Sequence, residues 1–323
     1  MILYFAPMEG VTSCVYRQVH ARCFPGADGY YAPFLAPDGQ GKCKASALRE
    51  LLPENNRDLH VIPQILTNSP EAFLALSREL AGMGYREVNL NAGCPSGTVV
   101  PKHKGAGMLS DPGELDAFLD RVFSECPIDV SVKTRLGLHS TAEFDRLLEV
   151  YERYPIRLLT VHARDREGMY RSRPDLDAFV RAAGQTRLPL CYNGDLVDLG
   201  SLALVREQVP RLECFMLGRG PAADPSLFRQ LRGGPRLSAE ELEGFLAQLT
   251  EAFLAWGLSE HFVLSRMKEL WYYLGSLFPG AERGRKRVLK AQHLWDYQTA
   301  VRALFAEGSF DPTSHFPGGL GSR

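Results

Sequence analysis

One short stretch of the chain combines a strand-like apolar pattern with groups that can do chemistry. It is Glu87-Val-Asn-Leu-Asn-Ala-Gly-Cys-Pro95, in which apolar residues alternate with Asn89 and Asn91 before a turn that carries Cys94. The pattern predicts a buried strand, and ligands of parallel α/β folds bind just past the carboxyl ends of the strands. Cys94 is therefore a candidate reactive thiol. The alternative is a structural thiol, because an unpaired cysteine often packs as a small hydrophobic residue.

Polar or charged residues follow most of the other strand-like runs. These candidates are Met8 with Glu9, Gln64, Lys133 with Arg135, His162 with Arg164, Asn193 with Asp195, and Arg219. Turns are polar in most proteins, so one such residue alone indicates little. Groups gathered from the ends of several strands are, however, typical of the active site of a closed barrel.

Glycine accompanies the last two of these strand ends. The turns Asn193-Gly-Asp195 and Gly218-Arg-Gly220 would leave backbone N–H groups free to meet phosphate oxygens, with Arg219 as the counter-charge. This pattern predicts a cofactor that bears a phosphate.

Strand-like runs alternate with helix-like segments through the first two thirds of the chain. The predicted strands cover residues 2–6, 29–32, 60–66, 86–91, 128–134, 157–162, 188–193 and 213–218. Residues that can cap a helix, often with an early proline, precede predicted helices at 71–82, 113–124, 142–154 and 226–231. A strand–helix unit repeated eightfold matches a (β/α)8 TIM barrel, whose typical length is ~250 residues.

A doubly wound open sheet is the structural alternative to the barrel. Such a sheet would be expected to place a G-x-G-x-x-G loop after its first strand. The chain instead has Ala6-Pro-Met-Glu-Gly10 there. We therefore predict an α/β fold with a TIM-barrel domain over residues 1–235.

A different pattern begins after the cluster Arg232-Gly-Gly-Pro-Arg236, which is typical of a linker. A capping box at Ser238 and Glu241 and apolar residues at helical spacing predict a small helical bundle. Its helices are expected at 239–256, 259–274 and 283–305, within a domain over residues 236–308. Residues 309–323, rich in Gly, Ser and Pro, are expected to form a flexible tail.

Composition restricts the class of protein. The chain has 323 residues, of which 45% are hydrophobic and 23% charged, and this suits a globular protein with a large core. Seven cysteines without a C-x-x-C pair argue against a disulfide framework and a zinc site, so we expect no metal. The first residues lack a basic leader and a long apolar run, so we expect a cytoplasmic protein that does not bind membranes. We also expect a monomer.

Several of these segments together resemble the tRNA-dihydrouridine synthase family of FMN-dependent barrel oxidoreductases. The segments are Ala6-Pro-Met-Glu-Gly-Val11, Asn89-Leu-Asn-Ala-Gly-Cys-Pro95, Val132-Lys-Thr-Arg-Leu-Gly137, Val161-His-Ala-Arg164, Asn193-Gly-Asp195 and Met216-Leu-Gly-Arg-Gly220. Arg266-Met-Lys-Glu-Leu-Trp-Tyr-Tyr-Leu274 also resembles a helix of the synthases that act at position 16. The resemblance implies reduction of specific uridines in the tRNA D-loop to 5,6-dihydrouridine. It also implies FMN as cofactor, NADPH as reductant and a tRNA-binding helical domain.

The resemblance also assigns roles to individual residues. It assigns the cofactor to Pro7, Met8, Glu9, Gln64, Lys133, His162, Asn193, Gly194, Asp195, Gly218 and Arg219. It assigns the substrate to Asn91, Arg135 and Arg164. Lys133 would lie at the pyrimidine edge of the flavin, where a fixed cation stabilises the anionic reduced form.

Cys94 would be the general acid under this resemblance. Hydride passes from flavin N5 to C6 of the uracil, and C5 then needs a proton from the opposite face. Thiols are mostly protonated at neutral pH and can supply that proton.

Binding of tRNA needs local basic patches, because the net charge is only −1. Basic clusters at 102–104, 164–173 and 283–290 could contact an RNA backbone, although such a run is often a solvated helix face. We expect the aromatic residues Trp271, Tyr272, Tyr273 and Trp295 in the core of the bundle.

Two other functions fit parts of the pattern. One is an FMN-dependent barrel oxidoreductase that acts on a small pyrimidine such as dihydroorotate, and it would not need the basic helical segment. The other is a non-catalytic RNA-binding protein, and the presence of both Cys94 and Lys133 argues against it.

Overall fold

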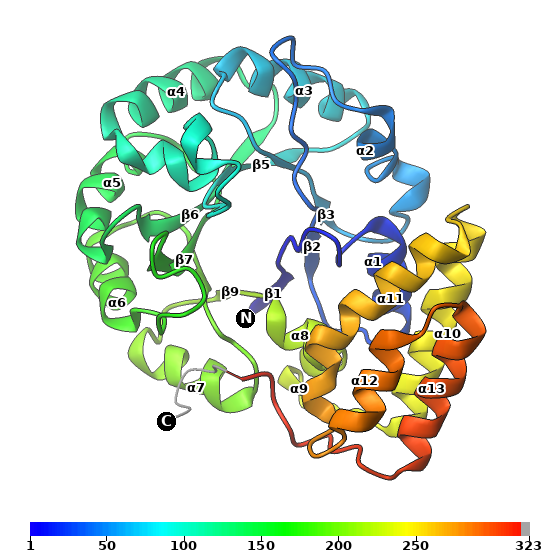
Figure 1. Ribbon diagram of the computed structural model, residues 1–323. Helices are drawn as coiled ribbons and strands as arrows, with labels where there is room; N and C mark the ends of the chain where they lie inside the picture. Colours follow the sequence, from blue (N-terminus) through cyan, green and yellow to red (C-terminus); the bar gives the residue numbers. More distant parts are fainter. Residues whose placement is uncertain (318–323) are drawn as a thin grey trace. The chain divides into compact units, whose positions relative to one another are not determined.

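The computed structural model describes residues 1–317, and a barrel forms the first part of the chain. Within these residues nine parallel strands form one sheet in the order β3-β2-β1-β9-β8-β7-β6-β5-β4. The strands are β1 (Ile2–Phe5), β2 (Gly29–Tyr31), β3 (Val61–Ile62), β4 (Gln64–Ile65), β5 (Glu87–Ala92), β6 (Asp129–Gly137), β7 (Leu159–Asp165), β8 (Leu190–Asn193) and β9 (Cys214–Leu217). They form a nearly closed ring (Figure 1), and the predicted TIM barrel is confirmed.

Pro63 explains why nine strands occupy eight positions. It separates β3 from β4, because proline has no backbone N–H for the ladder. Its carbonyl still accepts a hydrogen bond from Asn89 N at 2.8 Å, so the interruption is local. The predicted strand at 60–66 is thus present as two short pieces.

Helices cover the outside of the ring, as α3 (Pro70–Gly82), α4 (Pro112–Glu125), α5 (Phe144–Tyr151) and α6 (Leu176–Gln185) show in Figure 1. The starts of α3 and α4 follow the predicted caps. Ser69 Oγ accepts from Ala72 N at 3.2 Å, and Asp111 Oδ1 accepts from Gly113 N at 2.8 Å. Each cap satisfies a backbone donor that has no partner inside the helix.

The barrel interior has an apolar part and a polar part. Tyr31, Ile62, Cys191 and Met216 belong to one buried hydrophobic cluster from β2, β3, β8 and β9. Residues paired in register across β5, β6 and β7 instead bring amides, hydroxyls and cations together. These are Asn89, Asn91, Ser131, Lys133, Arg135, Thr160 and His162. These polar side chains therefore gather on one side of the ring.

Two compact units make up the chain. The first contains residues 1–7, 29–194 and 203–216, and the second contains residues 8–28, 195–202 and those from 217 onward. This division does not follow the boundary expected at residue 235. The additional helix α1 (Cys14–Cys23) joins the second unit, where Tyr16 and Phe24 pack edge-on against Phe245 of α10 (Ala239–Ala255).

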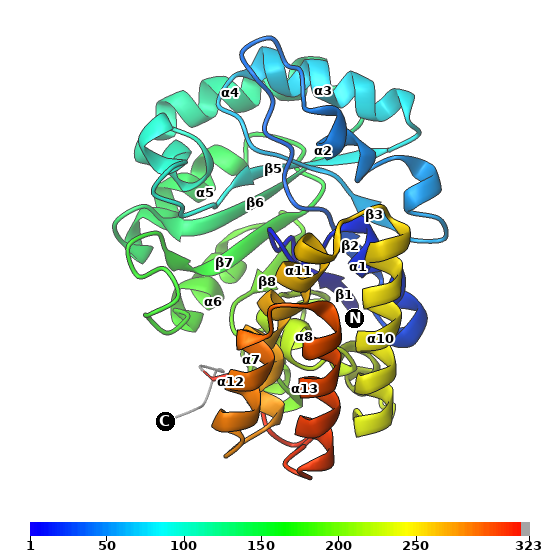
Figure 2. The same cartoon turned by 45° about the vertical axis from the view of Figure 1, so that its right-hand side comes forward.

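Four helices follow in the second unit, and Figure 2 shows them from the side. They are α10, α11 (Glu260–Leu274), α12 (Glu282–Lys290) and α13 (Leu294–Ala306). The capping box predicted at Ser238 is present, with Glu241 N donating to Ser238 Oγ at 3.2 Å. The single helix expected over 283–305 is wrong, because α12 ends at Lys290 and a second capping box at His293 and Asp296 begins α13.

The predicted tail begins with residues that pack against the second unit. Phe310 lies against Phe278 and Phe305, and Phe316 is buried against Tyr273. Residues 318–323 of the predicted tail lie outside the described residues.

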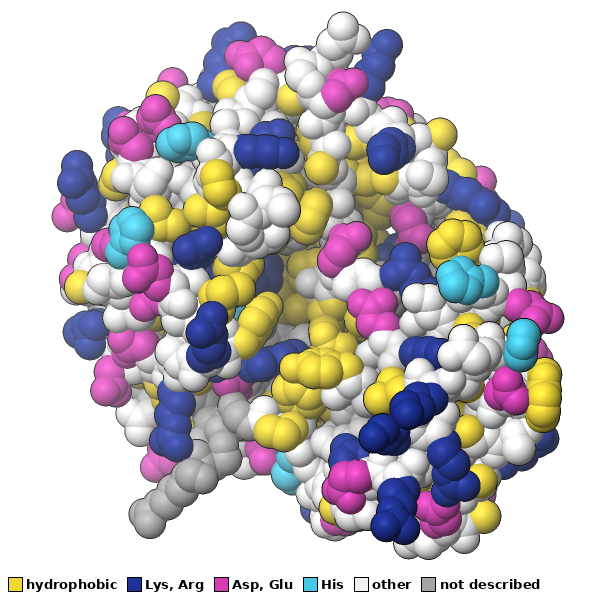
Figure 3. Space-filling view, viewed as in Figure 1, with side chains coloured by type: hydrophobic (Ala, Val, Ile, Leu, Met, Phe, Trp, Pro, Cys, Tyr) yellow, Lys and Arg dark blue, Asp and Glu magenta, His cyan; other side chains and the backbone are white. Residues whose placement is uncertain are grey.

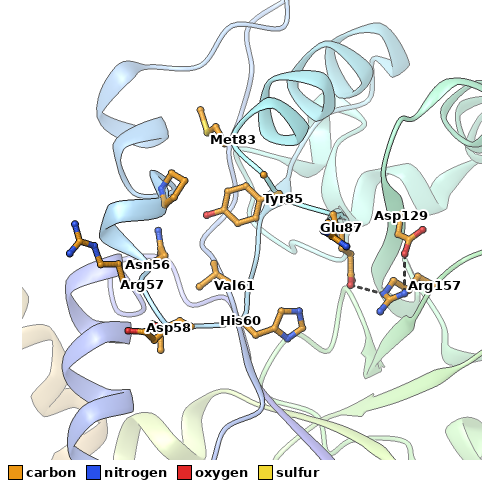
Figure 4. A pocket seen from close by; sticks show the side chains of 14 residues that line it. Asn56, Arg57, Asp58, His60, Val61, Met83, Tyr85, Glu87, Asp129 and Arg157 are labelled. Carbon is orange, nitrogen blue, oxygen red and sulfur yellow. Dashed lines mark hydrogen bonds and ion pairs between the residues drawn. The ribbon is translucent and has the colours of Figure 1, made fainter.

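A polar hollow of about 710 Å³ lies at the amino ends of the strands of the first unit (Figure 4). Arg157 is one of its lining residues and pairs with Glu87 and Asp129, each at 2.9 Å. The amino-terminal end of a TIM barrel serves stability, whereas active sites occupy the other end. We therefore assign these ion pairs to the scaffold. Within the described residues, no helix is both long and apolar enough to cross a membrane.

Candidate active site

The turn after β5 holds Cys94 in a fixed place. Asn91 Oδ1 accepts from Gly93 N at 3.1 Å and from Cys94 N at 2.9 Å. On the other side of the turn, Ala106 N donates to the Cys94 carbonyl at 3.0 Å. Cys94 is partly exposed, whereas Asn91 and Gly93 are buried. These three hydrogen bonds fix the backbone of the turn that carries the thiol at the carboxyl end of the strand.

Gln64 joins this turn from the neighbouring strand β4. Asn91 Nδ2 donates to Gln64 Oε1 at 2.8 Å, and both side chains are buried in the barrel interior. Two residues predicted for different ligands, Gln64 for the cofactor and Asn91 for the substrate, therefore meet directly.

Lys133 on β6 stands beside Asn91, its register partner on β5. The residue is only partly exposed, and protein surrounds its ammonium group. This desolvation, reinforced by nearby Arg135, lowers the pKa of Lys133 from 10.5 to about 8. A cation that loses hydration in this way favours an anionic ligand next to it.

Arg135 clamps the Cys94 turn to the end of β7. Its Nε donates to the Gly93 carbonyl at 2.8 Å, and its Nη1 donates to the Asp165 carbonyl at 2.9 Å. The side chain is 1% exposed, and burial lowers its pKa. Neither Lys133 nor Arg135 forms an ion pair with a carboxylate in the part of the chain that the structure describes. The excess positive charge of the site thus remains available to a ligand.

His162 and Arg164 complete the polar group of the first unit. Arg164 Nη1 lies 3.1 Å from His162 Nε2, and Arg164 Nε donates to the Ser172 carbonyl at 2.7 Å. Sequence reasoning did not include Tyr170, which is 53% exposed. Its ring lies 5.8 Å from that of His162 and 5.7 Å from Arg135 Cζ. An exposed aromatic ring above two polar groups is suited to stack on a flat ligand.

Replacing Lys133 with methionine should make the unfolding free energy of the apoprotein less dependent on pH. Between pH 8 and 10.5 the unfolded chain binds a proton that folded Lys133 has released. Stability of the natural protein therefore gains about 1.4 kcal/mol per pH unit from this group as pH rises. Urea unfolding of both proteins between pH 7 and 10 measures the difference. A difference that is constant across this range would contradict the assignment.

The second unit holds the turn that carries Met8 and Glu9. Val11 N and Thr12 N donate to the Met8 carbonyl, each at 3.0 Å, and Met8 N donates to Thr12 Oγ1 at 2.9 Å. Arg266, the first residue of the motif noted in α11, donates from Nη1 to the Gly10 carbonyl at 2.7 Å. Arg266 thus supports a turn distant in the sequence that the resemblance assigns to the cofactor.

The residues expected to bind phosphate are divided between the two units, and each group has its own hydrogen bonds or ion pair. Asn193 Nδ2 donates to the Met216 carbonyl at 2.8 Å in the first unit, where Gly194 has a φ of +155°. In the second unit, Arg219 pairs with Asp195, and its Cζ lies 5.4 Å from the centre of the Phe316 ring. Gly218 directly precedes the short helix α8 (Arg219–Ala223). A phosphate would therefore share Arg219 with Asp195.

A basic groove of about 560 Å³ runs between α12 and α13. It is lined by Arg283, Lys286, Arg287, Lys290 and Trp295 among others. Figure 3 shows the Lys and Arg side chains gathered over these two helices. Trp295 is 66% exposed and Tyr272 71%, so the expectation of a core position is wrong for both, whereas Trp271 is buried.

Comparison with known proteins finds the same family by two routes, a family model and individual relatives. A family model described as "Dihydrouridine synthase (Dus)" matches residues 4–277. The chain is 27% identical over 315 residues to "tRNA-dihydrouridine synthase B" of Pseudomonas aeruginosa, across 94% of this chain and 93% of that protein. It is 30% identical over 239 residues to "tRNA-dihydrouridine(16) synthase" of Ralstonia nicotianae, across 72% of each. The family match includes the Cys94 turn, Lys133 and the Arg266 motif.

Proposed function

The chain belongs to the dihydrouridine synthase family, and we propose that it reduces the C5=C6 bond of D-loop uridines in tRNA to 5,6-dihydrouridine. The observation that carries this proposal is the Cys94 turn at the carboxyl end of β5. Its backbone is held by Asn91, the register partner of Lys133 on β6. Because tRNA is the proposed substrate, we place the protein in the cytoplasm. The position-16 relative and the Arg266 motif together favour the uridine at that position.

The residues of the first unit fit FMN as the cofactor. The site offers desolvated cations without a carboxylate partner among the described residues, and it offers a fixed amide at Gln64. When bound, FMN supplies the hydride for uracil C6, and NADPH is the reductant that restores it. Gln64, Lys133 and His162 would hold the flavin ring, with Lys133 balancing the negative charge of the reduced form. Pro7, Met8, Glu9, Asn193, Gly194, Asp195, Gly218 and Arg219 are proposed for the rest of the cofactor.

Cys94 then completes the reduction. Its thiol transfers a proton to uracil C5, and the resulting thiolate takes a proton from water before the next turnover. Asn91 fixes the position of Cys94 at the end of β5, because its side-chain oxygen accepts a hydrogen bond from the backbone N–H of Cys94. Arg164 is proposed to hold the substrate, and Arg135 acts through the Gly93 carbonyl.

One assay tests the proposal against the small-pyrimidine alternative. Purified protein is incubated with FMN, NADPH and tRNA that lacks dihydrouridine, and the digested nucleosides are separated by chromatography. We expect dihydrouridine from tRNA and none from free uridine. Reduction of free uridine without reduction of tRNA would overturn the assignment. So would oxidation of dihydroorotate by the FMN-loaded protein, in a separate reaction without NADPH, if tRNA is not reduced. To identify the reductant, the rate of flavin bleaching without oxygen is measured in parallel reactions with NADH and with NADPH.

The basic groove is proposed as a contact for the tRNA backbone. Lys286→Glu with Lys290→Glu should weaken tRNA binding and flatten its salt dependence, because each lost phosphate contact lowers the slope of log K by about 0.9. Filter binding at several salt concentrations measures both effects. Arg302→Glu is the matched control, since Arg302 is exposed on α13 but does not line the groove. Equal losses in the two variants would show that the groove has no special role.

A further inference from the structure

Four buried side chains form one continuous line of hydrogen bonds across β4, β5 and β6. Asn91 Nδ2 donates to Gln64 Oε1 at 2.8 Å, and Gln64 Nε2 donates to Asn89 Oδ1 at 2.8 Å. Asn89 Nδ2 then donates to Ser131 Oγ at 3.0 Å. The line begins at the backbone N–H groups of Gly93 and Cys94, which donate to Asn91 Oδ1. We call these four residues, Asn91, Gln64, Asn89 and Ser131, the amide chain.

The Cys94 turn sets the direction of the whole amide chain. Two backbone N–H groups can only donate, so the atom of Asn91 that faces them must be its oxygen. Asn91 therefore turns its NH2 toward Gln64, and Gln64 must accept this hydrogen bond with Oε1. Gln64 in turn must present its NH2 to the oxygen of Asn89. Each amide orientation follows from the one before it.

Asn89 and Ser131 lie deeper in the barrel than the strand ends. Each stands two residues before a residue of the site on its own strand, Asn91 on β5 and Lys133 on β6. Two residues along a strand correspond to roughly 7 Å. Gln64, Asn89 and Ser131 are all 0% exposed, so a broken bond in the chain would leave buried polar groups without water.

We propose that Asn89, supported by Ser131, is the positioning residue for Gln64. With one hydrogen bond, to Asn91, the Gln64 amide can pivot; with a second, to Asn89, it is fixed. One N–H and one lone pair of Gln64 are used in the chain, and the others are left at defined positions for a ligand. This inference rests on the proposed function only for the identity of that ligand, the polar edge of a flavin.

A double-mutant cycle on FMN affinity tests the proposal. Asn89→Leu should weaken FMN binding about 10-fold in the natural background, because Gln64 loses its second anchor. In a Gln64→Ala background, Asn89→Leu should have no further effect, since the residue through which it acts is gone. An equal loss in both backgrounds would show a general structural role and overturn the proposal. Thr160→Val is the matched control, because Thr160 is buried in the same barrel and takes no part in the hydrogen bonds of the amide chain.

A second readout does not depend on the cofactor. In the ¹⁵N spectrum of the apoprotein, the side-chain amide protons of Gln64, assigned with Gln64→Glu, should exchange slowly with water. Asn89→Leu should accelerate this exchange at least 10-fold, Ser131→Ala should accelerate it less, and Thr160→Val should leave it unchanged. Rapid exchange in the natural protein would overturn the amide chain. Slow exchange in a protein that fails to reduce tRNA would instead sustain the chain and refute the proposed function.

Discussion

Replacing Cys94 with alanine is expected to lower the rate of uridine reduction in tRNA by about 10²–10⁴-fold, the usual contribution of a positioned general acid. The expected loss is confined to one half of the reaction. In the proposed mechanism, reduction of FMN by NADPH does not use the thiol, so flavin bleaching without oxygen should proceed at the natural rate. Fold stability should change little, because the thiol is partly exposed and the turn is held by the backbone of Cys94.

Rapid mixing separates the two halves of the reaction. The reduced variant is mixed with unmodified tRNA, and reoxidation of the flavin is followed by absorbance. Cys126→Ala is the matched control, because Cys126 is a free and partly exposed thiol at the end of α4. If Cys94→Ala reoxidised as fast as the control, the thiol would be a packing residue and another group would supply the proton.

Replacing Gly105 with alanine should lower activity about 10²-fold, although the substitution removes none of the groups proposed to react. Gly105 has a φ of +57°, and a Cβ there would lie 2.8 Å from the Cys94 carbonyl oxygen and 2.9 Å from the Cys94 Cβ. Real Cβ atoms do not approach other atoms so closely, so the turn must move. A displacement of 1 Å at a reacting group is enough for a loss of this size.

Gly97→Ala provides the control within the same loop. A Cβ at Gly97 meets nothing within 4 Å, and the residue is exposed. Its activity should equal that of the natural protein, whereas Gly105→Ala should lose activity and also unfold at a lower urea concentration. Natural activity in Gly105→Ala would mean that the position of Cys94 is not critical.

The barrel could be predicted because its signals are local. Apolar runs and helix caps such as Ser69 and Asp111 act within a few residues, and they indicated all eight strand positions. The break between α12 and α13 was missed because the N-cap residue of α13 is His293, which is not one of the residue types that commonly cap a helix. The exposure of Trp295 was missed because hydrophobic spacing alone does not show which face of a helix is covered.

The candidate site could be predicted only as a set of strand ends. Period-two alternation also places Asn89 and Ser131 in the interior with Asn91 and Lys133, so that signal was present in the sequence. Their hydrogen bonds depend on register between strands, which a single sequence does not reveal. Arg135 illustrates the same limit: its side chain binds two backbone carbonyls, and no pattern of residue types encodes such a contact.

The desolvated Lys133 links ligand capture to proton uptake. An anion bound beside this ammonium group raises the pKa of Lys133 from about 8, so binding at pH 8 or above draws a proton from the buffer. Affinity for the anion should then decline as the pH rises beyond 8. Titration calorimetry in buffers of different ionisation enthalpy counts that proton directly. Lys133 is therefore a group whose protonated form is stabilised by the anionic ligand that it binds.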